Sequence, residues 1–117
     1  MVIRKGPSET SEQIGLLTWF KNKFPGVLIY HTPNGEKRSI SVAVRLKKLG
    51  VVRGIPDLFV PSWKLFIEMK RVDGGTVSPD QKKIMAYLER VGYRCLVCRG
   101  ATDASRQILK FLEERNK

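Results

Sequence analysis

The sequence predicts an α/β sandwich, with a small mixed sheet of four strands and helices on both of its faces. Three observations predict it. Short apolar, β-prone runs alternate with longer segments in which apolar residues recur every three or four positions. Helix-capping residues begin these longer segments, and glycine or proline ends them. The resulting order is helix, strand, short helix, two strands, helix, strand and helix, which is typical of layered α/β domains.

The first helix is expected to begin near Thr10, because Thr10 and Gln13 have the spacing of a reciprocal N-terminal cap. Its apolar residues recur every four positions and share one face: Leu16, Phe20 and Phe24. Pro25-Gly26 would end this helix. Residues 1–8 are expected to form a flexible arm of a single domain that spans residues 1–117.

Two short elements are predicted next. Residues 27–30 form an apolar run that favours a first strand. Residues 39–49 fit a short second helix, which Gly50 would end. The apolar residues of this helix are expected to face the core: Val42, Leu46 and Leu49.

A β-hairpin follows in the predicted order. Asp57 opens an apolar strand that reaches Val60. Pro61-Ser62 turns the chain, and residues 63–71 form the returning strand. The carboxylate at position 57 therefore lies at the start of one hairpin strand.

The C-terminal part of the chain begins with a strong helix start at residues 78–81. Ser78 is the N-cap, Pro79 the first helical residue and Gln81 the reciprocal cap. Gly92 would end this helix. The last strand and the last helix are then predicted over residues 93–98 and 102–114.

The charge balance favours a polyanionic partner. The chain has 22 Lys and Arg against 11 Asp and Glu, a formal net charge of +11, and nucleic acid is the leading candidate. An anionic membrane surface and a merely basic soluble domain are the alternatives. No apolar run suits a membrane span, and the polar N-terminus lacks the pattern of a signal peptide. We therefore expect a cytoplasmic protein that is not secreted.

The residues most often found in zinc or redox sites are sparse. Cys95 and Cys98 form a lone C-x-x-C inside a predicted strand, where free cysteine behaves as a small hydrophobe. A zinc site would need four ligands, and the single histidine, His31, is far away in sequence. His31 itself is either a substrate contact or a surface residue at a strand end.

The pattern that carries chemistry is Asp57 followed by Glu68 and Lys70. Side chains alternate along a strand, so Glu68 and Lys70 point the same way and Met69 points to the opposite face. If the hairpin pairs, Asp57 and Glu68 converge, and carboxylates this close repel unless a cation lies between them. Hard oxygen ligands suit Mg²⁺ or Mn²⁺. Glu-x-Lys also occurs by chance on solvated edge strands, but here the acids lie within apolar strands.

A further carboxylate, Glu12, lies one turn before Leu16 on the apolar face of the first helix. A carboxylate on an inward face is costly unless something compensates it. Glu12 therefore either joins the acidic site or lies in a frayed, solvated first turn, where a negative charge is favourable in any case.

Three ordered motifs resemble those of the VRR-NUC family, the virus-type replication-repair nucleases of the PD-(D/E)XK superfamily. They are Gly54-Ile55-Pro56-Asp57-Leu58, Leu65-Phe66-Ile67-Glu68-Met69-Lys70 and Ser78-Pro79-Asp80-Gln81. Further similarities are Glu12-Gln13, Asn34, residues 46–50 and Gly92-Tyr93. The resemblance covers roughly residues 8–112 and implies a restriction-endonuclease-like core. In length the chain resembles the small standalone members of phages and prophages, which implies a bacterial or phage-infected host cell.

The resemblance implies a role for each site residue. Asp57 and Glu68, with the backbone carbonyl of Met69, would bind a catalytic Mg²⁺ or Mn²⁺. Lys70 would position or activate the attacking water, and Glu12 would complete the site. Gln81 would lie near the scissile phosphate or support Lys70, a role compatible with its place in the helix cap.

The substrate implied is DNA, contacted mainly through its phosphates. Basic residues that flank the motif loops are the best candidates for these contacts, although each is equally an ordinary solvated charge: Lys37, Arg38, Arg53 and Arg71. Asn34 joins them on the strength of the resemblance. No base-reading motif is visible, so recognition of DNA shape is expected.

The function implied is that of a homodimeric, structure-selective endonuclease that cuts branched DNA, similar to a Holliday-junction resolvase. The dimer is expected by analogy and because so small a domain has little surface for a four-way junction. Two alternatives stay open. One keeps the active site but acts on flaps, nicks or linear duplex, and the other is a non-catalytic basic DNA-binding module.

Overall fold

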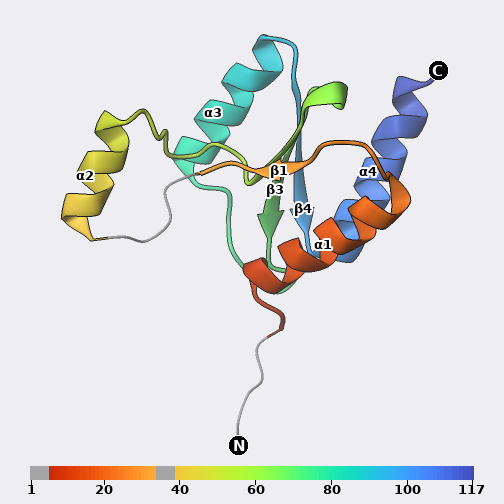
Figure 1. The fold of residues 1–117 in the computed structure, drawn as a ribbon, viewed down its shortest axis with the longest axis horizontal. Coiled ribbons are helices and arrows are strands. Elements are labelled where there is room, and N and C mark those ends of the chain that lie inside the picture. The colour runs from red at the N-terminus through yellow and green to blue at the C-terminus, as the bar shows by residue number, and fades with distance from the viewer. Residues whose placement is uncertain (1–5, 34–38) are drawn as a thin grey trace, which may run out of the picture.

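A computed structural model describes residues 6–33 and 39–117. Four helices are present: α1 (Glu9–Lys23), α2 (Ile40–Lys48), α3 (Pro79–Arg90) and α4 (Ala101–Arg115). Four strands form one sheet: β1 (Tyr30–His31), β2 (Leu58–Val60), β3 (Leu65–Lys70) and β4 (Arg94–Arg99). A short 3-10 turn, η1 (Pro61–Trp63), separates β2 from β3. The predicted order of elements is confirmed (Figure 1).

The sheet is mixed, with the strand order β1-β2-β3-β4. β2 is antiparallel to both β1 and β3, and β4 is parallel to β3. In the β2–β3 hairpin Leu58 pairs with Ile67, which places Asp57, one residue before β2, level with Glu68. The register therefore brings the two predicted carboxylates to the same end of the sheet.

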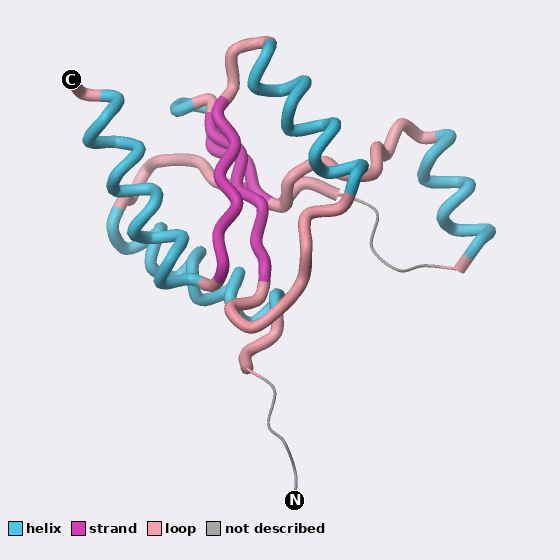
Figure 2. The backbone as a smooth tube through the Cα atoms, turned by 180° about the vertical axis from the view of Figure 1, so that it is seen from behind, coloured by secondary structure: helices cyan, strands magenta, loops and turns pink. Residues whose placement is uncertain are grey.

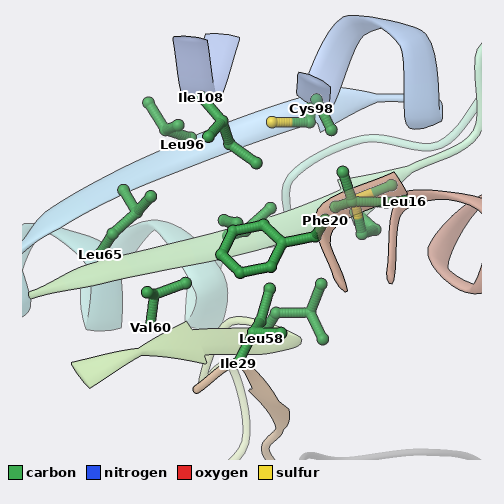
Figure 3. Packing of buried hydrophobic residues seen from close by; sticks show 12 residues of the cluster. Leu16, Phe20, Ile29, Leu58, Val60, Leu65, Leu96, Cys98 and Ile108 are labelled. Carbon is green, nitrogen blue, oxygen red and sulfur yellow. The ribbon is translucent and has the colours of Figure 1, made fainter. Parts of the chain in front are cut away.

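The main core lies between one face of the sheet and the helices α1 and α4 (Figures 1 and 3). The strands contribute alternate residues to it: Leu58, Val60, Leu65, Ile67, Met69, Leu96 and Cys98. The helices contribute Leu16, Phe20, Ala104 and Ile108. Burying such side chains contributes roughly 1.5–3 kcal/mol each to folding. Met69 points into this core, so Glu68 and Lys70 point to the other face, as strand alternation predicts.

The second face of the sheet carries aromatic residues and is approached by α3 (Figure 2). Phe59 and Phe66 stack with their ring centroids 4.2 Å apart, and Tyr93 packs against Phe66 at 5.6 Å. Cys95 lies on this face too, with its Sγ 3.9 Å from the Met85 carbonyl oxygen of α3. Glu68 and Lys70 thus stand at the polar end of a face that is otherwise apolar.

Helix α1 begins two residues earlier than the sequence predicted. Ser8 is the N-cap, and its hydroxyl accepts a hydrogen bond from the Ser11 N–H at 3.1 Å. Thr10 is already helical, so the cap predicted from Thr10 and Gln13 is wrong. The serine takes the cap because the chain enters the helix extended at Ser8, and this brings Glu9 into the first turn.

The N-terminal segment is anchored where it enters α1. The Gly6 N–H donates to Asp73 Oδ2 at 2.9 Å, and the Arg71 guanidinium donates to the Gly6 carbonyl at 3.0 Å. The arm predicted over residues 1–8 is therefore tied down at residue 6, and residues 1–5 lie outside the described part. Among the described residues, no helix has the length and apolarity that crossing a bilayer requires.

Helix α2 stands away from the sheet (Figure 1), and the expectation that its apolar residues face the core is wrong. None of its residues is buried. The Val42 side chain is 42% exposed, and Leu49, its C-cap, is 71% exposed. Helical periodicity predicts which residues share a face of a helix, but it does not predict whether another part of the chain covers that face.

Candidate active site

Three carboxylates meet at the end of the sheet where α1 begins. Glu9 is the first residue of α1, Asp57 precedes β2, and Glu68 lies on β3. One oxygen from each lies within 4.8 Å of the others. Glu68 is buried, Asp57 is half-buried and Glu9 is exposed, so the cluster opens toward solvent on the side of α1.

Asp57 is fixed by hydrogen bonds across the sheet. Its Oδ2 accepts from the Met69 N–H of β3 at 2.8 Å, and its carbonyl accepts from the Thr32 N–H at 2.8 Å. The Thr32 hydroxyl donates to the neighbouring Pro56 carbonyl. Backbone N–H groups of the neighbouring strand segments therefore fix Asp57, and the position of its carboxylate depends on the pairing of the sheet.

Glu68 is the most constrained member of the cluster, with only 2% of its surface exposed. Its Oε2 accepts from Gln81 Nε2 at 3.0 Å and lies 3.5 Å from Lys70 Nζ. Its Oε1 is buried and has no hydrogen-bond partner among the described residues. Burial and, second, the charge of Asp57 raise the pKa of the Glu68 carboxyl from 4.5 to about 8, against the opposing effect of Lys70.

Lys70 lies two residues further along β3 and is 6% exposed. Its ammonium donates to Gln81 Oε1 at 3.0 Å in addition to its contact with Glu68. An ammonium has three N–H donors, so these two contacts orient the group and leave one N–H for a third partner.

Gln81 joins the helix cap to the active-site groups. Its backbone N–H donates to Ser78 Oγ at 3.1 Å, and its side-chain Oε1 accepts from the Ser78 N–H at 2.9 Å, which completes the predicted capping box. The same side chain contacts both Lys70 and Glu68. The two interpretations of Gln81, as a cap and as a support for Lys70, are therefore both present in one side chain.

Gly54 sets the distance between the loop before Asp57 and helix α3. Its φ is +91°, and a Cβ at this position would lie 2.7 Å from the Asp80 backbone carbonyl carbon. Only glycine fits here without displacing backbone. The glycine lets the first turn of α3, which carries Gln81, pack directly against the Asp57 loop.

Glu12 does not join the cluster. Its carboxylate accepts a hydrogen bond from the Ala101 N–H at the start of α4, where the helix dipole favours a negative charge. Glu12 shares a face with Leu16 and so points toward the core and α4. Glu9, and not Glu12, is the helix carboxylate that joins Asp57 and Glu68. The sequence held a signal for Glu9 that we missed. With Ser8 as the N-cap, Glu9 and Gln13 are four residues apart in the helix and therefore share one face.

An open cleft of about 800 Å³ contains the cluster. Its lining includes Lys70, Gln81 and Asp80, and also Gln13 and His31. Gln13 Nε2 lies 3.3 Å from His31 Nδ1. From the sequence, His31 was either a substrate contact or a surface residue, and Gln13 was expected in the helix cap.

The predicted DNA contacts divide into three groups. Arg53 lines the cleft, in a position to meet a phosphate. Arg71 does not line it, because its guanidinium is paired with Asp73 at 3.1 Å and with the Gly6 carbonyl. The remaining three lie outside the described residues: Asn34, Lys37 and Arg38.

The two cysteines take no part in the cleft. Both are free thiols on β4. Burial, with a smaller effect of Glu89, raises the pKa of Cys95 to about 11. Burial, with a smaller effect of Asp103, raises that of Cys98 to about 12. Thiols this resistant to ionisation are poor ligands and nucleophiles, which fits their role as small core residues.

Comparison with known proteins decides the family. A family model of the VRR-NUC domain matches residues 8–102. The chain belongs to the VRR-NUC domain family. Among solved structures, a protein described as a VRR_NUC domain protein is 28% identical in sequence, with a TM-score of 0.76 over 93% of this chain and 91% of that chain. A search of the curated proteins found no match.

Membership makes this VRR-NUC domain a nuclease of the PD-(D/E)XK type, a hydrolase whose partner is DNA. The predicted family, fold class and enzyme class are thereby confirmed. Nucleases of this kind depend on a metal ion, and the acidic cluster fits one. A cation beside Glu68 would give its Oε1 a partner and offset the repulsion between Glu68 and Asp57.

The raised pKa of Glu68 predicts that the metal-free protein loses stability as the pH rises. The folded state holds this proton more tightly than the unfolded chain, so the contribution is complete below about pH 4.5 and is lost as the pH passes about 8. Glu68→Gln, which is neutral at every pH, removes this dependence. Thermal unfolding in EDTA between pH 5 and pH 8 should show the wild type losing a few kcal/mol relative to the variant, at roughly 1.4 kcal/mol per pKa unit. A difference that stays constant with pH would contradict the burial of an ionisable carboxyl.

Proposed function

We propose that this VRR-NUC domain is a Mg²⁺- or Mn²⁺-dependent, structure-selective endonuclease that hydrolyses phosphodiester bonds in branched DNA, as Holliday-junction resolvases do. One observation carries the proposal: Glu9, Asp57 and Glu68 bring their oxygens within 4.8 Å of one another, beside the ammonium of Lys70. Carboxylates this close repel one another unless a cation lies between them, and the Lys70 ammonium lies beside them.

The choice of ion follows from the donor set. The cluster offers carboxylate oxygens only, and these suit Mg²⁺ and Mn²⁺ better than softer metals. The backbone carbonyl of Met69 adds a further oxygen ligand in the proposal. The ion, once bound, would supply an acidified water and neutralise charge on the phosphate.

The residues around the cluster would perform the rest of the reaction. Lys70, oriented by Gln81 and Glu68, donates its third N–H to the attacking water or to a phosphate oxygen. Gln81 keeps this ammonium in place from the first turn of α3. Because Asp57 directly precedes β2 and Glu68 lies on the paired strand β3, the cluster is preorganised and needs little rearrangement when substrate arrives.

The substrate proposal combines charge with the open cleft. A net charge of +11 supports binding through phosphates. Among the described residues that were predicted to contact DNA, Arg53 lines the cleft. Such binding weakens steeply as salt rises. Since the sequence shows no base-reading motif, a branched DNA shape is the proposed determinant. Flaps, nicks and linear duplex are the alternative substrates.

We also propose that two copies assemble as a two-fold dimer through helix α2. The apolar side chains of α2 are exposed in the single chain, with Ile40 the most exposed at 85%. Ile40 and Val44 lie one turn apart on the same side of this helix, and exposed apolar side chains grouped in this way favour a contact site. A two-fold pair would carry two active sites, which matches the two symmetric cuts that a four-way junction requires.

Cleavage of a DNA panel tests the nuclease proposal. With Mg²⁺ or Mn²⁺, the wild type should cut a four-way junction faster than a flap, a nick or a linear duplex of the same sequence. Lys70→Ala should slow cleavage on the order of 10²–10⁴-fold, because it removes the ammonium that positions or activates the attacking water. Lys64→Ala, an exposed lysine at the other end of the β3 hairpin, is the matched control and should cut normally. Equal cleavage by Lys70→Ala would refute the assigned site, and faster cutting of flaps or duplex would refute the preferred substrate.

Sedimentation tests the dimer. Val44→Glu, on α2, should convert a dimer into a monomer, because it places a charge in the proposed apolar interface. Val91→Glu, at the end of α3, is the control, since Val44 and Val91 are 48% and 50% exposed. Two outcomes would contradict the dimer proposal. One is a wild type that sediments as a monomer at the highest protein concentration tested, and the other is equal dissociation of the Val44→Glu and Val91→Glu variants.

A further inference from the structure

We propose that Arg71 and Asp73 are positioning residues for the acidic cluster, because they fix the chain just before α1 and thereby hold Glu9 in place. The inference rests on the proposed nuclease function and deepens it, since it assigns two residues to the assembly of the metal site. Neither residue lines the cleft, so their effect on the cluster is indirect.

Glu9 is the member of the cluster that the fold restrains least. Glu68 lies on an inner strand, and Asp57 is hydrogen-bonded to the Met69 N–H. Glu9, by contrast, is exposed and is the first residue of α1. Helix ends fray, and three carboxylates within 4.8 Å repel one another unless a cation lies between them. Both effects would move the first turn of α1 away from the sheet unless something held it there.

A clamp formed by Arg71 and Asp73 holds the chain three residues before Glu9. The Gly6 N–H donates to Asp73 Oδ2 at 2.9 Å, and the Arg71 guanidinium donates to the Gly6 carbonyl at 3.0 Å. The guanidinium also donates to Asp73 Oδ1 at 3.1 Å. The backbone N–H and carbonyl of Gly6 are thus both bound by charged groups, which make the stronger kind of hydrogen bond.

The loop that carries the clamp is itself fixed to the sheet. Arg71 directly follows β3, the strand that carries Glu68. From β4, the Arg99 guanidinium donates to the Gly74 and Gly75 carbonyls at 2.8 and 2.9 Å. The clamp therefore ties the chain before α1 to the end of the strand that holds the buried carboxylate of the cluster.

The link between the clamp and Glu9 is short and stiff. Only Pro7 and Ser8 lie between Gly6 and Glu9. Proline fixes its own φ and restricts the residue before it. Ser8 is the N-cap, and its carbonyl accepts from the Glu12 N–H at 3.0 Å. A restraint at Gly6 is therefore passed to the first turn of α1, and its release should let this turn fray.

Mn²⁺ binding by Arg71→Ala tests this role, because the substitution has two effects of opposite sign. Removal of a positive charge alone would strengthen the binding of a cation, whereas release of Glu9 weakens it. We expect the affinity to fall about threefold to tenfold, and no further than in Glu9→Gln. Titration calorimetry without DNA measures it, and the absence of DNA separates this role from a phosphate contact by Arg71.

A double-mutant cycle shows whether the effect passes through Glu9. In the Glu9→Gln background, Arg71→Ala should no longer weaken Mn²⁺ binding, since the carboxylate that the clamp positions has been removed. Asp73→Ala should likewise weaken binding more in the presence of Glu9 than in its absence. Lys64→Ala removes an exposed positive charge at the start of β3 and is the control, which should bind as the wild type does.

Amide hydrogen exchange provides a second measurement, which needs no metal. The Glu12 N–H, bonded to the Ser8 carbonyl, should exchange at least about threefold faster in both clamp variants, because the first turn opens more often. The Phe24 N–H, bonded to the Phe20 carbonyl at the other end of α1, should exchange at an unchanged rate. An ion pair this exposed contributes little to global stability, so both variants should fold.

Three results would overturn the inference. The first is Mn²⁺ binding by Arg71→Ala that equals or exceeds that of the wild type. The second is an equal loss of affinity with and without Glu9, and the third is unchanged exchange of the Glu12 N–H. Failure of the proposed function gives a different pattern, because the wild type would then bind no Mn²⁺, or would bind it and cut no DNA, while hydrogen exchange would still report on the clamp.

Discussion

The buried carboxylate of Glu68 is the constraint on which the rest of the site depends. A charged oxygen removed from water is costly unless another group compensates it. Lys70 and Gln81 compensate one oxygen of Glu68, but no described residue meets the other. Burial and, second, the charge of Asp57 raise the pKa of this carboxyl to about 8 in the metal-free protein, so it holds a proton more tightly than an ordinary glutamate. A divalent cation would displace the proton and satisfy the same oxygen.

The fold holds this costly arrangement in place with backbone contacts. Glu68 lies on β3, an inner strand with β2 on one side and β4 on the other. Asp57 is fixed through the Met69 N–H, and Gln81 through the close approach of α3 to Gly54. Because these groups belong to rigid elements, their relative positions are set during folding, before substrate or metal binds.

The parts of the site predicted from sequence are those that depend on local geometry. Strand alternation placed Glu68 and Lys70 on one face, and the spacing of Ser78 and Gln81 gave the capping box. The missed parts depend on neighbours distant in sequence. Whether Glu9 or Glu12 enters the cluster depends on Ser8 being the cap and on the start of α4 lying beside Glu12. The exposure of α2 likewise depends on where its loops carry it, which helical periodicity does not encode.

The most direct test of the account is the affinity of the metal-free protein for Mn²⁺, measured by titration calorimetry. Glu9→Gln and Glu12→Gln make the same chemical change three residues apart on one helix. The account predicts that Glu9→Gln weakens binding at least about tenfold, a loss of roughly 1.4 kcal/mol, while Glu12→Gln leaves the affinity near that of the wild type. The reverse order, or no Mn²⁺ binding by the wild type, would contradict the claim that Glu9, Asp57 and Glu68 hold the ion.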